Sequence, residues 1–233
     1  MMIFLKIILF LFLGLVALLA IGFAYMVYKF NHPTIPKVKP GGIRLACVGD
    51  SITQGSRSYP SILQELLGED TQVLNYGHSG RTLVKTGDNP YWKSALFQPS
   101  LEANPAIVLI MLGTNDSKPQ NWNAPDFEKQ LFELLDLYRG LPGQPEVYLL
   151  TPPAAFFLKG KKEAIFKVNP TIIENEIVPI LRRAAEQTAV PLVDVFSATQ
   201  GHPEYFSEGV HPNPVGRKVI AETVYAALKK SGF

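Results

Sequence analysis

The sequence has little cysteine and no long run of charge of one sign. Cys47 is the only cysteine, so no disulfide can form within the chain, and no Cys/His spacing typical of a zinc site is present. Because Cys47 lies in the apolar run Leu45 to Val48, we expect a buried small side chain rather than a reactive thiol. The 22 basic and 20 acidic residues give a formal net charge of +2 without a basic tract, so nucleic acid is not an expected partner.

There is no internal repeat, and 233 residues leave room for one ordinary globular domain plus an appendage at the N-terminus. Ile7 to Tyr28 runs for 22 residues without a charge, close to the ~20 residues that cross a bilayer as a helix. Residues 1–30 are therefore predicted to be one transmembrane helix or a signal. The best small-x-small cleavage site, Gly22-Phe23-Ala24, lies deep inside the apolar run, which favours an uncleaved anchor over a cleaved signal and a secreted domain.

Residues 31–42 contain three prolines and two glycines and are predicted to be a stiff linker between the anchor and the domain. The charges around the span favour a domain in the cytoplasm, because basic residues near a span favour the cytoplasmic side. Lys6 alone precedes the span, and four basic residues follow it: Lys29, Lys37, Lys39 and Arg44.

Residues 43–233 alternate short apolar runs with longer helical patterns, which is typical of βαβ units and a parallel sheet. The predicted strands are Ile43–Val48, Val73–Asn75, Ile107–Leu112, Val147–Leu150 and Leu192–Val195. The predicted helices include Tyr59–Leu67, Asp126–Tyr138, Ile172–Gln187 and Val215–Lys229. The pattern predicts an α/β fold, a three-layer α/β/α sandwich around a five-stranded parallel sheet.

Ligands of open parallel sheets bind outside the carboxyl ends of the strands. The segments that follow the first four predicted strands begin Gly49-Asp50-Ser51, Tyr76-Gly77-His78-Ser79-Gly80, Gly113-Thr114-Asn115-Asp116 and Thr151-Pro152-Pro153. A fifth segment, Glu208-Gly209-Val210-His211-Pro212, stands just before the last predicted helix. These segments are where chemistry is expected.

A serine hydroxyl needs a base, a group that orients the base, and donors for the oxyanion that forms on the substrate. Ser51 offers a hydroxyl and a backbone N–H, Gly80 a second N–H, and Asn115 a side-chain amide. His211 is the candidate base, and Glu208, three residues earlier, is placed to reach its other ring nitrogen.

In this order, Gly49-Asp50-Ser51, Gly80, Gly113-Thr114-Asn115-Asp116 and Val210-His211-Pro212 resemble the sequence blocks of the SGNH (GDSL) hydrolases, across residues 43 to 231. The resemblance implies a flavodoxin-like α/β/α fold and ester hydrolysis without a metal or other cofactor. It also implies Ser51 as nucleophile, His211 as base, and an oxyanion hole formed by Ser51, Gly80 and Asn115.

One residue departs from the family pattern, which usually has Asp three residues before the histidine where this chain has Glu208. Three alternatives remain open: Glu208 orients His211, a backbone carbonyl does so in a Ser-His dyad, or the site no longer works. Structural roles are also open, with Ser51 as a helix N-cap and His211 as a surface turn residue. His78 and His202 are rival bases.

The substrate is less well defined by the sequence. Arg81 and Trp92 follow the first two blocks and are predicted to bind the substrate. The runs around Trp92, Asn115 and His202 resemble SGNH members that act as carbohydrate O-acetylesterases, so the expected partner is a small-molecule or glycan ester. A glycan substrate would place the anchored domain outside the cytoplasm, against the literal charge rule.

Two other functions remain open. The apolar run Ala154 to Leu158, beside three lysines, suggests an interfacial loop of a lysophospholipase or thioesterase. The third alternative is a non-catalytic binding module that keeps the fold. The oligomeric state is not predicted.

Overall fold

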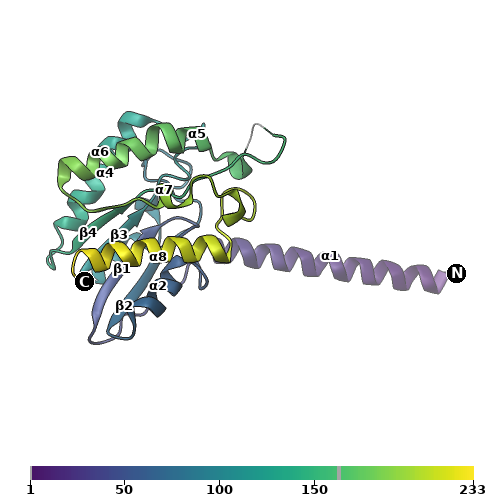
Figure 1. Cartoon of the computed structure of the whole chain (residues 1–233). Coiled ribbons are helices and arrows are strands. Elements are labelled where there is room, and N and C mark those ends of the chain that lie inside the picture. The colour runs from purple at the N-terminus through teal and green to yellow at the C-terminus, as the bar shows by residue number, and fades with distance from the viewer. Residues whose placement is uncertain (1, 162–163) are drawn as a thin grey trace. The chain divides into compact units, whose positions relative to one another are not determined.

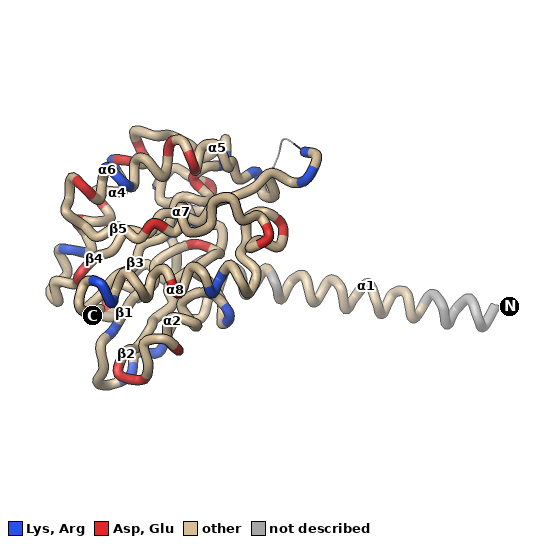
Figure 2. Tube along the Cα trace, in the orientation of Figure 1, with Lys and Arg blue, Asp and Glu red and all other residues tan. Residues whose placement is uncertain are grey.

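The computed structural model describes residues 2–161 and 164–233, and in its first helix it describes the side chains of residues 10–25, 27 and 28. The chain divides into two compact units, Met1–Thr34 and Ile35–Phe233 (Figure 1). The second unit carries all of the motifs that predicted chemistry. Acidic and basic positions are interspersed over it (Figure 2), in agreement with the absence of a basic tract.

The first unit consists mainly of helix α1, Met2–Asn31, which contains the predicted span. Within the described residues, no helix is both long and apolar enough to cross a membrane, so the structure does not support the transmembrane helix predicted from Ile7–Tyr28. Residues 7–9 and Met26 of that run lie outside the described side chains. The longest unbroken stretch of described side chains in α1, residues 10–25, is shorter than the apolar run.

The second unit is built on a five-stranded parallel sheet with the strand order β2-β1-β3-β4-β5. The strands are β1 Ile43–Gly49, β2 Thr71–Gly77, β3 Ile107–Met111, β4 Glu146–Leu150 and β5 Leu192–Val193. The chain leaves β1 in one direction to β2 and then crosses back to β3 on the other side. The carboxyl ends of β1 and β3 therefore flank the point where the direction of winding changes, which is where such sheets bind ligands.

Helices cover both faces of the sheet (Figure 1). Alternate residues of the strands point to opposite faces. On one face, Leu45, Cys47 and Leu109 pack with side chains of α2 and α8, and on the other, Val108 and Ile110 pack with α4 and α6. The main helices are α2 Tyr59–Leu67, α4 Ala124–Arg139, α6 Val178–Thr188 and α8 Pro214–Lys230. The predicted three-layer sandwich is confirmed, and Cys47 is buried in it.

Short helices fill most of the connections. These are η1 Tyr91–Lys93, α3 Phe97–Glu102, η2 Ile165–Lys167, α5 Pro170–Ile172, the π-helical η3 Ile173–Ile177, α7 Val195–Thr199 and η4 Pro203–Tyr205. The last predicted strand is two residues too long, because the Asp194 carboxylate accepts the Ser197 N–H and begins α7. The predicted helix Ile172–Gln187 starts earlier, at α5, where Asn169 caps the chain.

Candidate active site

Ser51 lies in a tight turn that directly follows β1. Asp50 Oδ1 accepts the Ile52 N–H at 2.9 Å, and the Gln54 N–H donates to the Asp50 carbonyl at 3.0 Å. Gly49 lets the strand end close against its neighbour, because a Cβ there would overlap Thr53 and lie 2.8 Å from the Met111 carbonyl oxygen. The turn is not a helix N-cap, since the next helix, α2, begins only at Tyr59.

The turn brings Ser51 to His211, which lies 160 residues further along the chain. Ser51 Oγ and His211 Nε2 are 3.0 Å apart, within hydrogen-bond reach. Asn213 fixes the end of the histidine segment, because its side chain accepts the N–H groups of Val215 and Gly216 and begins α8. The His211 side chain keeps 34% of its surface exposed, so this contact is open to solvent on one side.

Glu208 contacts the other ring nitrogen of the histidine. Its Oε1 atom lies against His211 Nδ1 and also accepts the His211 backbone N–H at 3.1 Å. The turn between them depends on Gly209, whose φ of 87° suits glycine and whose Cβ position lies 2.6 Å from the Phe156 carbonyl oxygen. The Phe156 N–H donates to the Gly209 carbonyl at 2.8 Å, which ties the turn to the segment after β4.

The opposite side of Ser51 is formed by segments that follow β2 and β3. Asn115 Nδ2 donates to Asp50 Oδ2 at 3.3 Å and to the Arg81 carbonyl oxygen at 3.2 Å. Within the described part of the chain, the backbone N–H groups of Ser51 and Gly80 have no protein acceptor. Two backbone N–H groups without an acceptor, one of them on Ser51 itself, and an amide side chain are the kind of donor set that stabilises an oxyanion.

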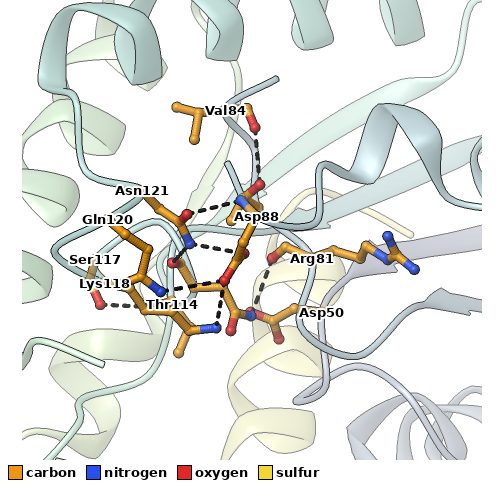
Figure 3. Close-up of polar contacts among 11 residues, drawn as sticks. Asp50, Arg81, Val84, Asp88, Thr114, Ser117, Lys118, Gln120 and Asn121 are labelled. Atoms are coloured by element: carbon orange, nitrogen blue, oxygen red, sulfur yellow. Dashed lines mark hydrogen bonds and ion pairs between the residues drawn. The ribbon is translucent and has the colours of Figure 1, made fainter. Parts of the chain in front are cut away.

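Asn115 is bonded to a polar network that includes Asp88, Lys118 and Asn121 (Figure 3). Asn121 Nδ2 donates to the Asn115 carbonyl at 2.9 Å and to Asp88 Oδ1 at 3.0 Å, and the Asp88 N–H donates back to Asn121 Oδ1 at 2.9 Å. Lys118 Nζ lies 3.7 Å from Asp88 Oδ2 with most of its side chain buried. The network connects the segment after β2 to the segment after β3, so the two sources of donors cannot shift independently.

Two carboxyl groups are buried beneath this side of the site. Burial raises the pKa of Asp116 to about 7, although the carboxylate accepts the Val84 N–H at 2.9 Å and the Leu83 N–H at 3.0 Å. Burial also raises the pKa of Asp50 to about 6, against the opposing effect of the Ile52 N–H. Both residues tie loop backbone into place.

Ser51 and His211 open into a cavity of about 360 Å³. The cavity is lined by Ser51, Ile52, Gln54, Gly55, Ser56, Arg57, Ser58, His211, Pro212 and Arg217. Its volume is within the range of small-molecule sites. Among the described residues, no group of three or more His, Cys, Asp or Glu side chains is arranged to hold a metal ion.

The sequence blocks that build this geometry lie inside a region that matches a known family. The model of the GDSL-like Lipase/Acylhydrolase family matches residues 47–219. The chain belongs to this family. The matched region of this GDSL-like chain includes Ser51, Gly80, Asn115, Glu208 and His211.

The relatives of this GDSL-like chain include esterases of several kinds. The acetylxylan esterase of Xylanibacter ruminicola is 32% identical over 84% of this chain, and the chain spans 45% of the length of that protein. The structure of a carbohydrate acetylesterase family member from Sinorhizobium meliloti matches with a TM-score of 0.66 and 23% identity, over 81% of this chain and 98% of that one. The aryl esterase of M. smegmatis matches with a TM-score of 0.64 and 20% identity, over 81% and 99%. At these identities, the two structures show the fold alone.

The predicted substrate-binding residues of the GDSL-like chain, Arg81 and Trp92, lie in different surroundings. Arg81 is 9% exposed and contacts His78 through Nη2 at 3.0 Å, and burial lowers the pKa of its guanidinium. Trp92 donates its indole N–H to the Leu83 carbonyl at 2.8 Å, and Lys85 Nζ lies 4.2 Å from its ring centroid. Neither residue lines the cavity at Ser51, so their binding role remains a prediction.

Neither rival histidine of the GDSL-like chain contacts Ser51 through a described bond. His78 is buried against Arg81 and Ser94, and His202 pairs with Glu204 on the surface at 2.8 Å. Sequence reasoning missed Arg217, which lines the cavity one turn into α8. Its position six residues after His211, at the start of an amphipathic helix, was the available signal.

Proposed function

We propose that the protein is a serine esterase that works through an acyl-enzyme. One observation carries the proposal: Ser51 Oγ lies 3.0 Å from His211 Nε2, while Glu208 occupies the other side of the same ring. A hydroxyl, a base and an orienting carboxylate in this order are the arrangement that activates a serine. The free N–H groups of Ser51 and Gly80 supply the other half of the site.

In the proposed reaction, His211 Nε2 takes the Ser51 proton as Oγ attacks the ester carbonyl carbon. The carbonyl electron pair moves onto oxygen, where Ser51 N–H, Gly80 N–H and Asn115 Nδ2 stabilise it; the amide exchanges its long 3.3 Å bond to Asp50 for a bond to the oxyanion. Collapse breaks the ester C–O bond, and His211 gives its proton to the leaving alcohol. Water then repeats the steps, releases the acid and restores Ser51.

We propose carbohydrate O-acetyl esters as the substrates. The 32% identity to a protein named acetylxylan esterase supports this class. The cavity also supports it, since seven of its ten lining residues, all but Ile52, Gly55 and Pro212, carry polar side chains. A sugar needs such hydrogen-bonding partners to fix its orientation.

The direct test compares hydrolysis of p-nitrophenyl acetate, p-nitrophenyl octanoate and an acetylated sugar by the wild type and Ser51→Ala. We expect acetyl-selective activity that Ser51→Ala abolishes. Ser197→Ala, the same change at an exposed position of α7 that does not line this cavity, is the matched control and should keep its activity. Acetyl hydrolysis that survives Ser51→Ala would overturn the proposed nucleophile.

A lipid ester is the second candidate, because the segment after β4 exposes apolar surface. Phe157 is 47% exposed, and a cavity of about 480 Å³ is lined in part by Ala154, Ala155 and Phe156. A preference for octanoate in the same assay would favour a lysophospholipase or thioesterase. A chain whose Ser51 fails to react with a fluorophosphonate would instead be a binding module.

We also propose that the N-terminal segment anchors the domain at a membrane and that the domain faces outward. The uncharged 22-residue run Ile7–Tyr28 and the exposed apolar side chains of α1, such as Phe10 and Leu18, support the anchor. A glycan substrate supports the outward orientation. A reporter fused after Phe233 that is active only in the cytoplasm would overturn the orientation, and release of the chain by alkaline carbonate would overturn the anchor.

A further inference from the structure

The cavity at Ser51 carries two guanidinium groups that the proposed reaction does not use. Arg57 and Arg217 line it together with Ser51 and His211, and none of its ten lining residues is Asp or Glu. In the described part of the chain, neither arginine forms an ion pair with a carboxylate. Basic positions lie where α8 begins (Figure 2). The cavity therefore has uncompensated positive charge beside the nucleophile.

Arg217 is held in a fixed position at the mouth of this cavity. Its Nε donates to the Pro212 carbonyl at 2.8 Å and its Nη1 to the Arg57 carbonyl at 3.2 Å. These bonds leave Nη2 without a protein acceptor among the described residues. Because two backbone carbonyls already orient this guanidinium, ligand binding costs little further side-chain conformational entropy.

Arg57 lies in the exposed loop between Ser51 and α2, and its carbonyl accepts the bond from Arg217. No described group accepts a hydrogen bond from its side chain, while the neighbouring Ser58 is buried and bonded to Gly55. The planar guanidinium of Arg57 suits a carboxylate, which accepts two parallel N–H bonds from such a group.

We propose that Arg57 and Arg217 form a subsite for the carboxylate of an acidic saccharide, such as a uronic acid, that carries the ester cleaved at Ser51. The inference rests on the proposed esterase function and narrows its substrate class. An acetyl group is neutral and small, so the anion belongs to the alcohol portion of the ester. Because one cavity holds both arginines and the Ser51–His211 pair, the carboxylate lies on the acetylated sugar or on the next one.

The test measures binding by titration calorimetry to the full chain that carries Ser51→Ala, so that no ester is cleaved. The ligands are a mono-O-acetyl methyl glucuronoside, its neutral uronamide of the same shape, and sn-glycerol 3-phosphate. We expect the uronate to bind roughly tenfold more tightly than the uronamide, with a difference that shrinks as salt is raised. Equal affinity, or no binding of either sugar, would overturn the subsite.

Arg57→Gln, added to Ser51→Ala, should remove most of the preference for the uronate, because it removes one of the two guanidinium groups. The fold should be kept, because the Arg57 side chain has no described contact to lose. Arg217→Lys keeps the charge without the fork and should retain part of the preference. Lys218→Gln removes the same charge one residue away and should leave the preference intact. Tighter binding of glycerol phosphate than of the uronate would overturn the saccharide and point to a phospholipid headgroup.

Turnover separates this inference from the proposed function. Hydrolysis of uronate and uronamide at equal rates by the wild type would overturn the subsite and keep the esterase. Preferential binding of the uronate without hydrolysis of either ester would keep the subsite and overturn the esterase.

Discussion

The two sides of the Ser51 site differ in how deeply their side chains are buried. On the strand-end side, Asp50 is 1% exposed and Asn115 is 6% exposed. On the other side, the His211 and Glu208 side chains remain 34% and 26% exposed. Donors for a developing charge gain from being fixed in advance, whereas a base that moves protons and admits water needs access. Substitutions on the exposed side should therefore lower kcat alone, whereas substitutions on the buried side should also lower the free energy of unfolding.

The largest loss is expected at the exposed side. His211→Ala should lower kcat by roughly 10⁴-fold or more, because the Ser51 hydroxyl loses its base. The free energy of unfolding should change little, since the residue is partly exposed. Steady-state kinetics and urea unfolding check both, and His202→Ala, a surface histidine, should match the wild type. Full activity in His211→Ala would exclude it as the base.

Glu208→Gln should lower kcat by between ~10² and ~10⁴, since an amide stabilises the imidazolium poorly and favours the wrong tautomer. Glu208→Asp keeps the charge on a shorter side chain, and its kcat should lie between those of Glu208→Gln and the wild type. The measurement is kcat for both variants at the same pH. A Glu208→Gln rate equal to the wild-type rate would favour the dyad.

At the buried side, Asn115→Ala should lower kcat by ~10²–10³, the usual cost of one oxyanion donor. Unlike His211→Ala, it should also lower the free energy of unfolding by about 1–3 kcal/mol, because Asp50 and the Arg81 carbonyl lose a buried donor. Asn123→Ala, which removes only the α4 cap, should destabilise the chain without slowing turnover. An unchanged kcat in Asn115→Ala would remove the amide from the mechanism.

Gly209→Ala should reduce kcat/KM by roughly tenfold, because the turn that carries Glu208 must move away from the Phe156 carbonyl. Gly201→Ala is the matched control, since Gly201 also has a positive φ, 77°, but a Cβ there meets nothing within 4 Å. Equal kinetics in the two alanine variants would show that the close approach to Phe156 at Gly209 does not affect turnover.

The smallest effect on turnover is expected at Asp116, whose influence is on stability. Burial raises its pKa from 3.8 to about 7, so between these values the folded chain holds a proton that the unfolded chain has lost. This stabilisation, a few kcal/mol in order of magnitude, is full below about pH 4 and is lost as the pH rises through about 7. Urea unfolding across this range should show a steeper fall for the wild type than for Asp116→Asn. Parallel curves would contradict the shift.

The sequence was sufficient for the layers and for the order of the site segments. Buried strands such as β1 and β3 are continuous apolar runs, and the motif residues directly follow them. The short α7 was missed because its start depends on one side-chain bond from Asp194 rather than on periodicity. The span predicted from the uncharged run Ile7–Tyr28 is not supported in the described residues.

Within the site, the approach of Ser51, Glu208 and His211 followed from motif order, but the contacts that maintain it did not. Nothing in the spacing of Asp88 and Asn121 reveals that they bond across two loops to hold Asn115. Trp92 was proposed from its residue type, and its indole is bonded to Leu83 under Lys85. Long-range polar pairs depend on how loops fold over a sheet, which local patterns do not encode.

The crowded end of β1 has a consequence for how this protein can change over evolution. Gly49 admits no side chain, so the nucleophile turn tolerates little variation. A few residues on, the side chains of Ser56 and Arg57 are exposed and can change without disturbing the packing. Substitutions in this loop can alter what the cavity accepts while the reactive serine stays in place, so new substrate preferences can arise here without rebuilding the catalytic machinery.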